Sequence, residues 1–288
     1  MSSTRHRKIP LIKEYRIQKL TKCLECFDKF AYHREKQRDC VLELYPNKGS
    51  KTLEHREKSI FRGMVIPSLR YLGLIIGFGD IIKPSANGKL IVESQFDNEL
   101  YERCWRAVIF EIDKRFFNFL EIIKQRRFSK NNLIEVLSGQ IEGASFRQKK
   151  ERIEKWLSIL HQVELIEYSV DISLNENNYK QVLLDINPDL KNFEKFCDYV
   201  IDKYYKLGRS SAGIVDIREL REAVALMFLK ERHILTEEQF DHLLRKFITT
   251  TLYLHISLGE PMGADQKLFK YKGKFYKTII MKRKEVLK

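Results

Sequence analysis

Apolar and polar positions alternate along the chain in a way that divides it into helical stretches separated by short breaks. In residues 11–45 the apolar side chains recur at steps of three and four, with Lys, Arg and Glu between them. This spacing is typical of an amphipathic helix. Similar patterns recur in residues 96–114, 116–125, 129–139, 145–165, 190–206, 216–230 and 236–249. The sequence therefore predicts a mainly helical protein.

Pairs of short extended runs interrupt these helices at three places. The pairs are residues 80–83 with 89–92, residues 165–170 with 181–186, and residues 268–272 with 274–281. The first pair flanks Asn87-Gly88, a strong hairpin signal because both residues accept positive φ angles at low cost. We therefore expect a mainly α fold with small β-hairpins, in the α+β class.

The order of elements before each hairpin is the same. A helix or helix pair, a glycine-containing stop and a two-stranded hairpin follow one another, which is the order found in a winged helix-turn-helix. A chain of 288 residues is long enough for two or three compact units. The sequence thus predicts three tandem winged modules, in residues 1–95, 96–187 and 188–288, the last with a basic wing.

One passage carries a resemblance to a known class of domain. Residues 146–166, FRQKKERIEKWLSILHQVELI, resemble the passage from recognition helix to wing in winged-helix DNA-binding domains, and residues 70–75, RYLGLI, are similar. Tandem modules of this kind are similar to the recognition domains of type IIS restriction endonucleases. They are also similar to DNA-binding subunits of prokaryotic defence and replication-initiation systems. The resemblance implies DNA binding and carries over no catalytic residue.

The charge of the chain is concentrated at its two ends. The formal net charge is +14; residues 1–70 hold 17 Lys and Arg against 8 Asp and Glu, and residues 265–288 hold 9 against 2. Such a distribution favours a polyanionic partner. Basic flanks without any partner are the alternative.

Phosphate contacts would come from basic side chains at helix starts and wings. The candidates are Arg56, Lys58, Arg62, Arg70, Arg147, Lys149, Lys150, Arg152, Lys270, Lys272, Lys274 and Lys277. For the four on the helix that begins near Ser145, the alternative is a solvated face paired with Glu151 and Glu154. The third module offers its wing rather than its helix, because residues 237–247 begin with acidic side chains.

Pro67 leaves the groove-facing residues of the first module open. Proline removes a backbone donor and crowds the preceding helical turn. Either the helix kinks at this point, or one helix ends near Val65 and another starts with Pro67 in its first turn. The first arrangement would present His55, Arg56, Lys58 and Arg62, whereas the second would present Arg70 more prominently.

The five cysteines are an odd number spread over a long chain, which fits reduced thiols better than a disulfide framework. Cys23 and Cys26 could begin a zinc site with Cys40 and a histidine. However, no second knuckle follows, and the two cysteines also share one helix face, where they would act as small apolar residues. We therefore expect no cofactor and no metal.

Two short fragments could supply carboxylates and a lysine to a Mg²⁺ nuclease: Asp171 with Asp189 and Lys191, and Glu260 with Asp265 and Lys267. Both are expected by chance in so charged a chain, and no nucleotide-binding or zinc-protease motif is present. Our expectation is a non-catalytic protein that binds double-stranded DNA.

Such a protein would be a recognition or loading subunit for a separate enzyme of a nucleic-acid-processing or defence system. The alternatives are a protein–protein adaptor that uses winged helices for packing and, third, a divergent Mg²⁺ nuclease. No run reaches the roughly 18 apolar residues of a membrane span. We expect an intracellular location, in the cytoplasm with the nucleoid or in a nucleus, and self-association into a homo-oligomer remains open.

Overall fold

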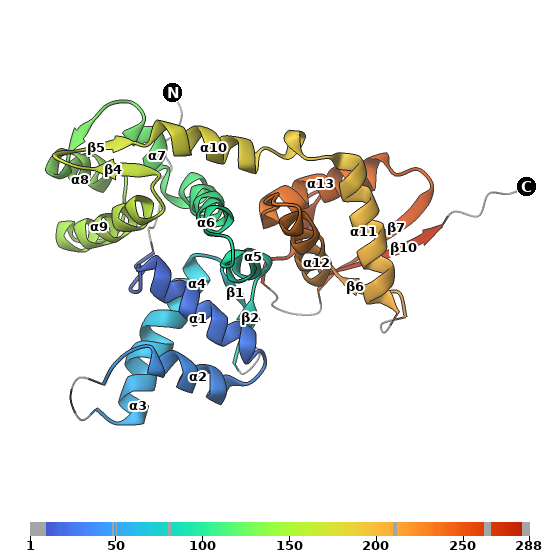
Figure 1. Ribbon diagram of the computed structural model, residues 1–288, viewed down its shortest axis with the longest axis horizontal. Coiled ribbons are helices and arrows are strands. Elements are labelled where there is room, and N and C mark those ends of the chain that lie inside the picture. The colour runs from blue at the N-terminus through green and yellow to red at the C-terminus, as the bar shows by residue number, and fades with distance from the viewer. Residues whose placement is uncertain are drawn as a thin grey trace, which may run out of the picture.

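The computed structural model describes residues 10–47, 49, 51–79, 82–209, 212–261 and 266–283. Helices hold 61% of these residues and strands 13%, all in small antiparallel sheets. The expected mainly helical α+β class is therefore confirmed. Figure 1 shows three lobes, with the N-terminal and central parts of the chain on the left and the C-terminal part on the right. We call residues 10–95, 96–187 and 188–283 the N-terminal, central and C-terminal segments.

The N-terminal segment is a helical unit with one very short strand pair. Its elements are α1 (Ile17–Lys29), α2 (Arg34–Glu43), α3 (Leu53–Arg56), η1 (Glu57–Val65), α4 (Ile66–Tyr71), β1 (Ile75–Ile76), β2 (Lys83–Pro84) and α5 (Ala86–Ser94). The elements α3, η1 and α4 form one continuous helix, in which η1 is wound as a π-helix. Figure 1 places α5 on the side of this segment that faces the rest of the molecule.

The predicted hairpin around Asn87-Gly88 is wrong. Ser85 begins a helix instead, because its hydroxyl accepts the N–H of Gly88 at 3.2 Å. Leu90 and Ile91, which were assigned to a strand, are buried on α5. Of the first predicted strand, Asp80 and Ile81 lie outside the described residues, and Lys83 pairs with Ile76.

In the central segment, a pair of helices follows the first strand of a three-stranded sheet and precedes the other two strands in sequence. Its elements are α6 (Asn98–Ile112), η2 (Asp113–Phe117), α7 (Phe119–Ile123), β3 (Phe128–Ser129), α8 (Lys130–Ser138), α9 (Phe146–Gln162), β4 (Ile166–Tyr168), β5 (Asp171–Leu174) and α10 (Glu176–Ile186). The predicted second strand at residues 181–186 is wrong, because these residues belong to α10. Asn175 starts that helix by accepting the N–H of Asn178 at 3.2 Å. The hairpin turn lies earlier in the chain, at Ser169 and Val170 between β4 and β5.

The C-terminal segment repeats this arrangement and adds a second hairpin. Its elements are η3 (Pro188–Leu190), α11 (Phe193–Gly208), β6 (Val215–Asp216), α12 (Ile217–Lys230), α13 (Glu237–Thr250), β7 (Leu254–Gly259), β8 (Phe269–Tyr271), β9 (Lys274–Tyr276) and β10 (Thr278–Arg283). The predicted helix pair and closing hairpin are confirmed in outline, although the last strand separates into β9 and β10.

The central and C-terminal segments share one sheet topology. In both, a strand, two helices and two further strands of the same sheet follow in sequence, and the last strand lies in the middle: β3-β5-β4 and β6-β10-β7. In the C-terminal segment the separate β8–β9 hairpin is inserted between β7 and β10. Buried apolar side chains from all three segments form one connected cluster. No described helix has the length and apolar character that a membrane span requires.

One disulfide departs from the expectation of reduced thiols. Cys26 on α1 is bonded to Cys40 on α2, with 5.8 Å between their Cα atoms. Their neighbour Cys23 is buried, and burial raises the pKa of its thiol to about 12. Among the residues that the structure describes, no group of three or more His, Cys, Asp or Glu side chains could hold a metal ion.

Candidate nucleic-acid interface

The start of α9 is one of the predicted contact regions that the fold leaves exposed to solvent. Ser145 and Gln148 form a capping box, which satisfies backbone donors at the first turn. The later turns are anchored in the core: the Trp156 ring stacks on Phe117 at 4.1 Å, and its indole N–H donates to Asp113 at 2.7 Å. The first turns therefore extend outward from a well-anchored helix. In Figure 1, α8 and α9 lie at the edge of the molecule away from the C-terminal lobe.

The four predicted residues of α9 divide into two pairs. Arg147 and Lys150 are exposed to solvent. Lys149 is half-buried and donates to the carbonyl oxygen of Ser138 at 3.1 Å, which ties α9 to the end of α8. Arg152 is also half-buried and has a partner within the chain. The structure thus leaves Arg147 and Lys150 as the side chains of this set best placed for an external contact.

The two acids that could have neutralised this surface have other partners. Glu151 is 2.6 Å from the Lys155 ammonium, and Glu154 is 3.2 Å from that of Lys130. The four basic residues at the start of α9 outnumber these two carboxylates, so this surface keeps its positive character.

The N-terminal candidates are dispersed by the fold. Arg56 donates from one guanidinium nitrogen to the carbonyls of Leu42 and Tyr45, both at 2.7 Å, and so caps the end of α2. Arg70 donates to the Gly77 carbonyl at 2.9 Å. These two half-buried side chains therefore support the fold, and their guanidinium groups are less available for an outside contact than the sequence pattern suggests.

Lys58 and Arg62 remain exposed on η1, and Arg62 is paired with Glu57 at 2.5 Å. The helix continues through Pro67, which lies in the first turn of α4, and the N–H of Ile66 reaches back five residues to Phe61. The π-winding therefore accommodates the proline without a break, and neither predicted arrangement describes it fully.

The basic wing of the C-terminal segment is the hairpin β8–β9. Lys270, Lys272 and Lys274 are exposed on it, and Lys274 lies 3.1 Å from Glu260. Lys277 is half-buried between β9 and β10 and has a partner within the chain. Arg245, which the sequence pattern did not single out, joins the hairpin to α13 by donating to the Lys270 carbonyl at 2.9 Å.

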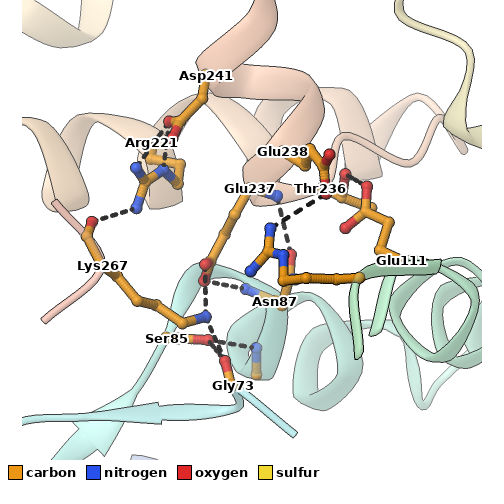
Figure 2. A network of polar contacts seen from close by, with 12 residues as sticks. Gly73, Ser85, Asn87, Glu111, Arg221, Thr236, Glu237, Glu238, Asp241 and Lys267 are labelled. Carbon is orange, nitrogen blue, oxygen red and sulfur yellow. Dashed lines mark hydrogen bonds and ion pairs between the residues drawn. The ribbon is translucent and has the colours of Figure 1, made fainter. Parts of the chain in front are cut away.

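The acidic start of α13 is docked against the N-terminal segment (Figure 2). Glu237 and Asn87 exchange two hydrogen bonds of 3.0 and 3.1 Å between backbone N–H groups and side-chain oxygens. The Lys267 ammonium is 2.5 Å from Glu237 and also donates to the Gly73 carbonyl. A second ion pair joins Arg221 to Asp241 at 2.7 Å. The start of this helix is therefore used for packing between segments.

Burial governs the electrostatics of this contact. Burial lowers the pKa of Lys267. Burial also tends to raise the pKa of Glu237, but the charges of Lys267 and Arg221 outweigh it and leave that pKa below its ordinary value. The charged forms of Lys267 and Glu237 thus stabilise each other, since either charge without its partner would be costly in this environment.

The two nuclease fragments lose their lysines to structural contacts. Lys191 donates to the carbonyl of Asp185 at 2.8 Å, and Lys267 belongs to the ion pair just described. Asp265 lies outside the described residues.

The sequence analysis did not select Arg126 and Arg127, which line a shallow hollow with Glu167 beside β5. Their position directly before β3 was the available signal.

Comparison of the chain with protein-family models, with curated proteins and with solved structures found no match. Any functional conclusion therefore rests on the geometry of the chain itself.

Proposed function

We propose that the protein binds double-stranded DNA through the central segment, with α9 directed at the major groove and the β4–β5 turn lying along the backbone as a wing. The single observation that carries this proposal is the exposed, basic start of α9, in a segment whose sheet has the strand order β3-β5-β4. In a winged helix-turn-helix, the second helix of the pair enters the groove, and its N-terminal residues contact base edges.

Arg147 and Lys150 have distinct roles in this proposal. Arginine can donate two parallel hydrogen bonds to a guanine edge, whereas lysine acts as a compact charge toward a phosphate. The exposed Val170 at the β4–β5 turn and the Tyr168 beside it would lie against the sugar-phosphate backbone. No catalytic step is assigned, so a separate enzyme would process the bound DNA and this chain would recognise or load it.

A salt titration of duplex binding tests the proposal. Binding of a mixed-sequence 20-base-pair duplex should weaken linearly with salt on a double-logarithmic plot, because bound phosphates release counterions. The double variant Arg147→Glu/Lys150→Glu should lose roughly 100-fold in affinity at low salt. Lys180→Glu/Lys230→Glu is the control, because both lysines are exposed elsewhere and the net charge changes equally. Salt-independent binding, or equal losses in the two variants, would contradict the proposal.

A protein–protein adaptor is the second candidate, and the docked α13 favours it. The C-terminal segment has the same strand order as the central one, yet the start of its second helix packs against Asn87 of the N-terminal segment. A segment of this topology can therefore serve in packing, and fold alone does not fix function. Under this alternative, Arg147→Glu/Lys150→Glu leaves co-purification with a protein partner intact and no duplex binding is seen in the unmodified protein.

A further inference from the structure

An open hollow of about 490 Å³ lies between the start of α2 and η1, in the N-terminal segment. His33, Arg34, Lys36 and Arg38 line it from the α2 side, and Glu57 and Arg62 line it from η1. Including Glu35, the lining holds four permanent cations against two carboxylates. Of these lining residues, only Arg62 was among the predicted phosphate contacts, so the hollow is a separate feature of the molecule.

Three arginines of this hollow converge on one carboxylate. Glu57 is 2.5 Å from Arg62, 3.5 Å from Arg38 and 3.9 Å from Arg34. Arg38 also pairs with Asp39 at 2.8 Å. Glu57 is the most buried of the converging side chains, whereas Arg62 is the most exposed of them. With Glu35 and Asp39 counted beside Glu57, three carboxylates face the four cations of the hollow, so one net positive charge remains there.

The π-winding of η1 explains how Arg62 comes to this position. In an α-helix, residues five apart point in directions that differ by about 140° and do not meet. A π-helix bonds residue i to i+5, which brings Glu57 and Arg62 to one side of the helix. Gly63 permits this winding, because a Cβ there would lie 2.8 Å from the Lys58 carbonyl oxygen. Such windings are rare and frequently occur at functional sites.

We propose that this hollow binds a phosphate group, held by Arg34, Arg38 and Arg62. The planar guanidinium fork matches a phosphate and offers it paired hydrogen bonds. The hollow is open to solvent, so the phosphate can belong to a free phosphorylated compound or to a nucleic-acid backbone. The second source rests on the proposed DNA-binding function, whereas the first does not.

Calorimetric titration of the full chain with sodium pyrophosphate tests the site directly. We expect saturable binding that weakens at least 10-fold in Arg34→Ala/Arg62→Ala. Glu57→Gln should bind pyrophosphate several-fold more tightly, because it removes the competing carboxylate and leaves the arginines in place. This opposite direction separates a loss of charge from a loss of structure, and circular dichroism checks that each variant is folded. Absence of saturable binding, or binding unchanged in both variants, would overturn the proposal.

Measuring DNA duplex binding by the same variants then identifies the source of the phosphate. If Arg34→Ala/Arg62→Ala also weakens binding of the 20-base-pair duplex, the site accepts a backbone phosphate. If duplex binding is unchanged while pyrophosphate binding is lost, the site takes a free phosphorylated compound; either result supports a phosphate site. Arg147→Ala/Lys150→Ala should leave pyrophosphate binding unchanged, so failure of the α9 proposal remains distinguishable from failure of this one. A parallel loss of pyrophosphate binding in that variant would place the anion at α9 and overturn the assignment.

Discussion

The central and C-terminal segments have the same strand order and begin the second helix of their pair with the same capping box, yet they place that helix start in opposite environments. Ser145 of α9 is exposed and is followed by Arg147, whereas Thr236 of α13 is fully buried and is followed by Glu237. An exposed, basic helix start can contact a polyanion, and an acidic one can be buried against a lysine. The comparison shows that topology alone does not decide which copy forms an external surface.

The largest expected effect comes from breaking the ion pair that docks α13. Lys267→Met leaves Glu237 charged at the contact between segments, and loss of one partner of a mostly buried pair should lower the free energy of unfolding by about 3 kcal/mol. Urea unfolding measures this change. The matched control is Lys272→Met on the exposed hairpin, with an expected change within about 0.5 kcal/mol.

A double variant sharpens that experiment. Lys267→Met/Glu237→Gln removes both charges, so it should be less destabilised than Lys267→Met alone. Equal destabilisation of the single and double variants would mean that the charges of the pair do not hold α13 against the N-terminal segment.

The two capping boxes offer a comparison of intermediate size. Thr236→Ala should cost about 2 kcal/mol, because the buried hydroxyl accepts the N–H of Gln239 and also donates to half-buried Glu111. Ser145→Ala removes a cap exposed to water and should cost about 0.5–1 kcal/mol. Thermal unfolding of both variants tests this order, and equal costs would show that the docking of α13 adds nothing to its cap.

Local sequence patterns were sufficient to predict these two helices. The pairs Ser145 with Gln148 and Thr236 with Gln239 lie three residues apart, and both boxes form in the structure. The Asn87-Gly88 hairpin was predicted by the same local reasoning and was wrong. Ser85 caps α5, and Asn87 bonds to Glu237, which is 150 residues away in the chain. Such tertiary contacts override turn propensity and leave no local signal.

The candidate contact surface was predictable only in part, for a similar reason. Arg56 and Arg147 are both basic residues on predicted helices and look alike in sequence. In the structure, Arg56 donates to the Leu42 and Tyr45 carbonyls, whereas Arg147 is exposed. The hollow at η1 was missed because its key pair, Glu57 and Arg62, has a five-residue spacing that no α-helical pattern brings together.

A pH dependence is also expected in the docked segment, from Glu111 beside the start of α13. Burial and the nearby charges of Glu238 and Glu237 raise the pKa of Glu111, the hydrogen bond from Thr236 and the charge of Arg115 lower it, and the net pKa is about 8. The folded protein therefore keeps this carboxyl protonated at pH values where the unfolded chain ionises it. The associated stability is complete below pH 4.5 and is lost as the pH rises toward 8.

Glu111→Gln tests this effect because glutamine imitates the protonated acid at every pH. The free energy of unfolding of the variant, minus that of the unmodified protein, should increase by about 3 kcal/mol between pH 5 and pH 8. A matched glutamine at exposed Glu167, beside the start of the β4–β5 turn, should give a difference that stays level. A level difference for Glu111→Gln as well would mean that water reaches this carboxyl, and that the start of α13 is less fully enclosed than its contacts with Asn87 and Lys267 imply.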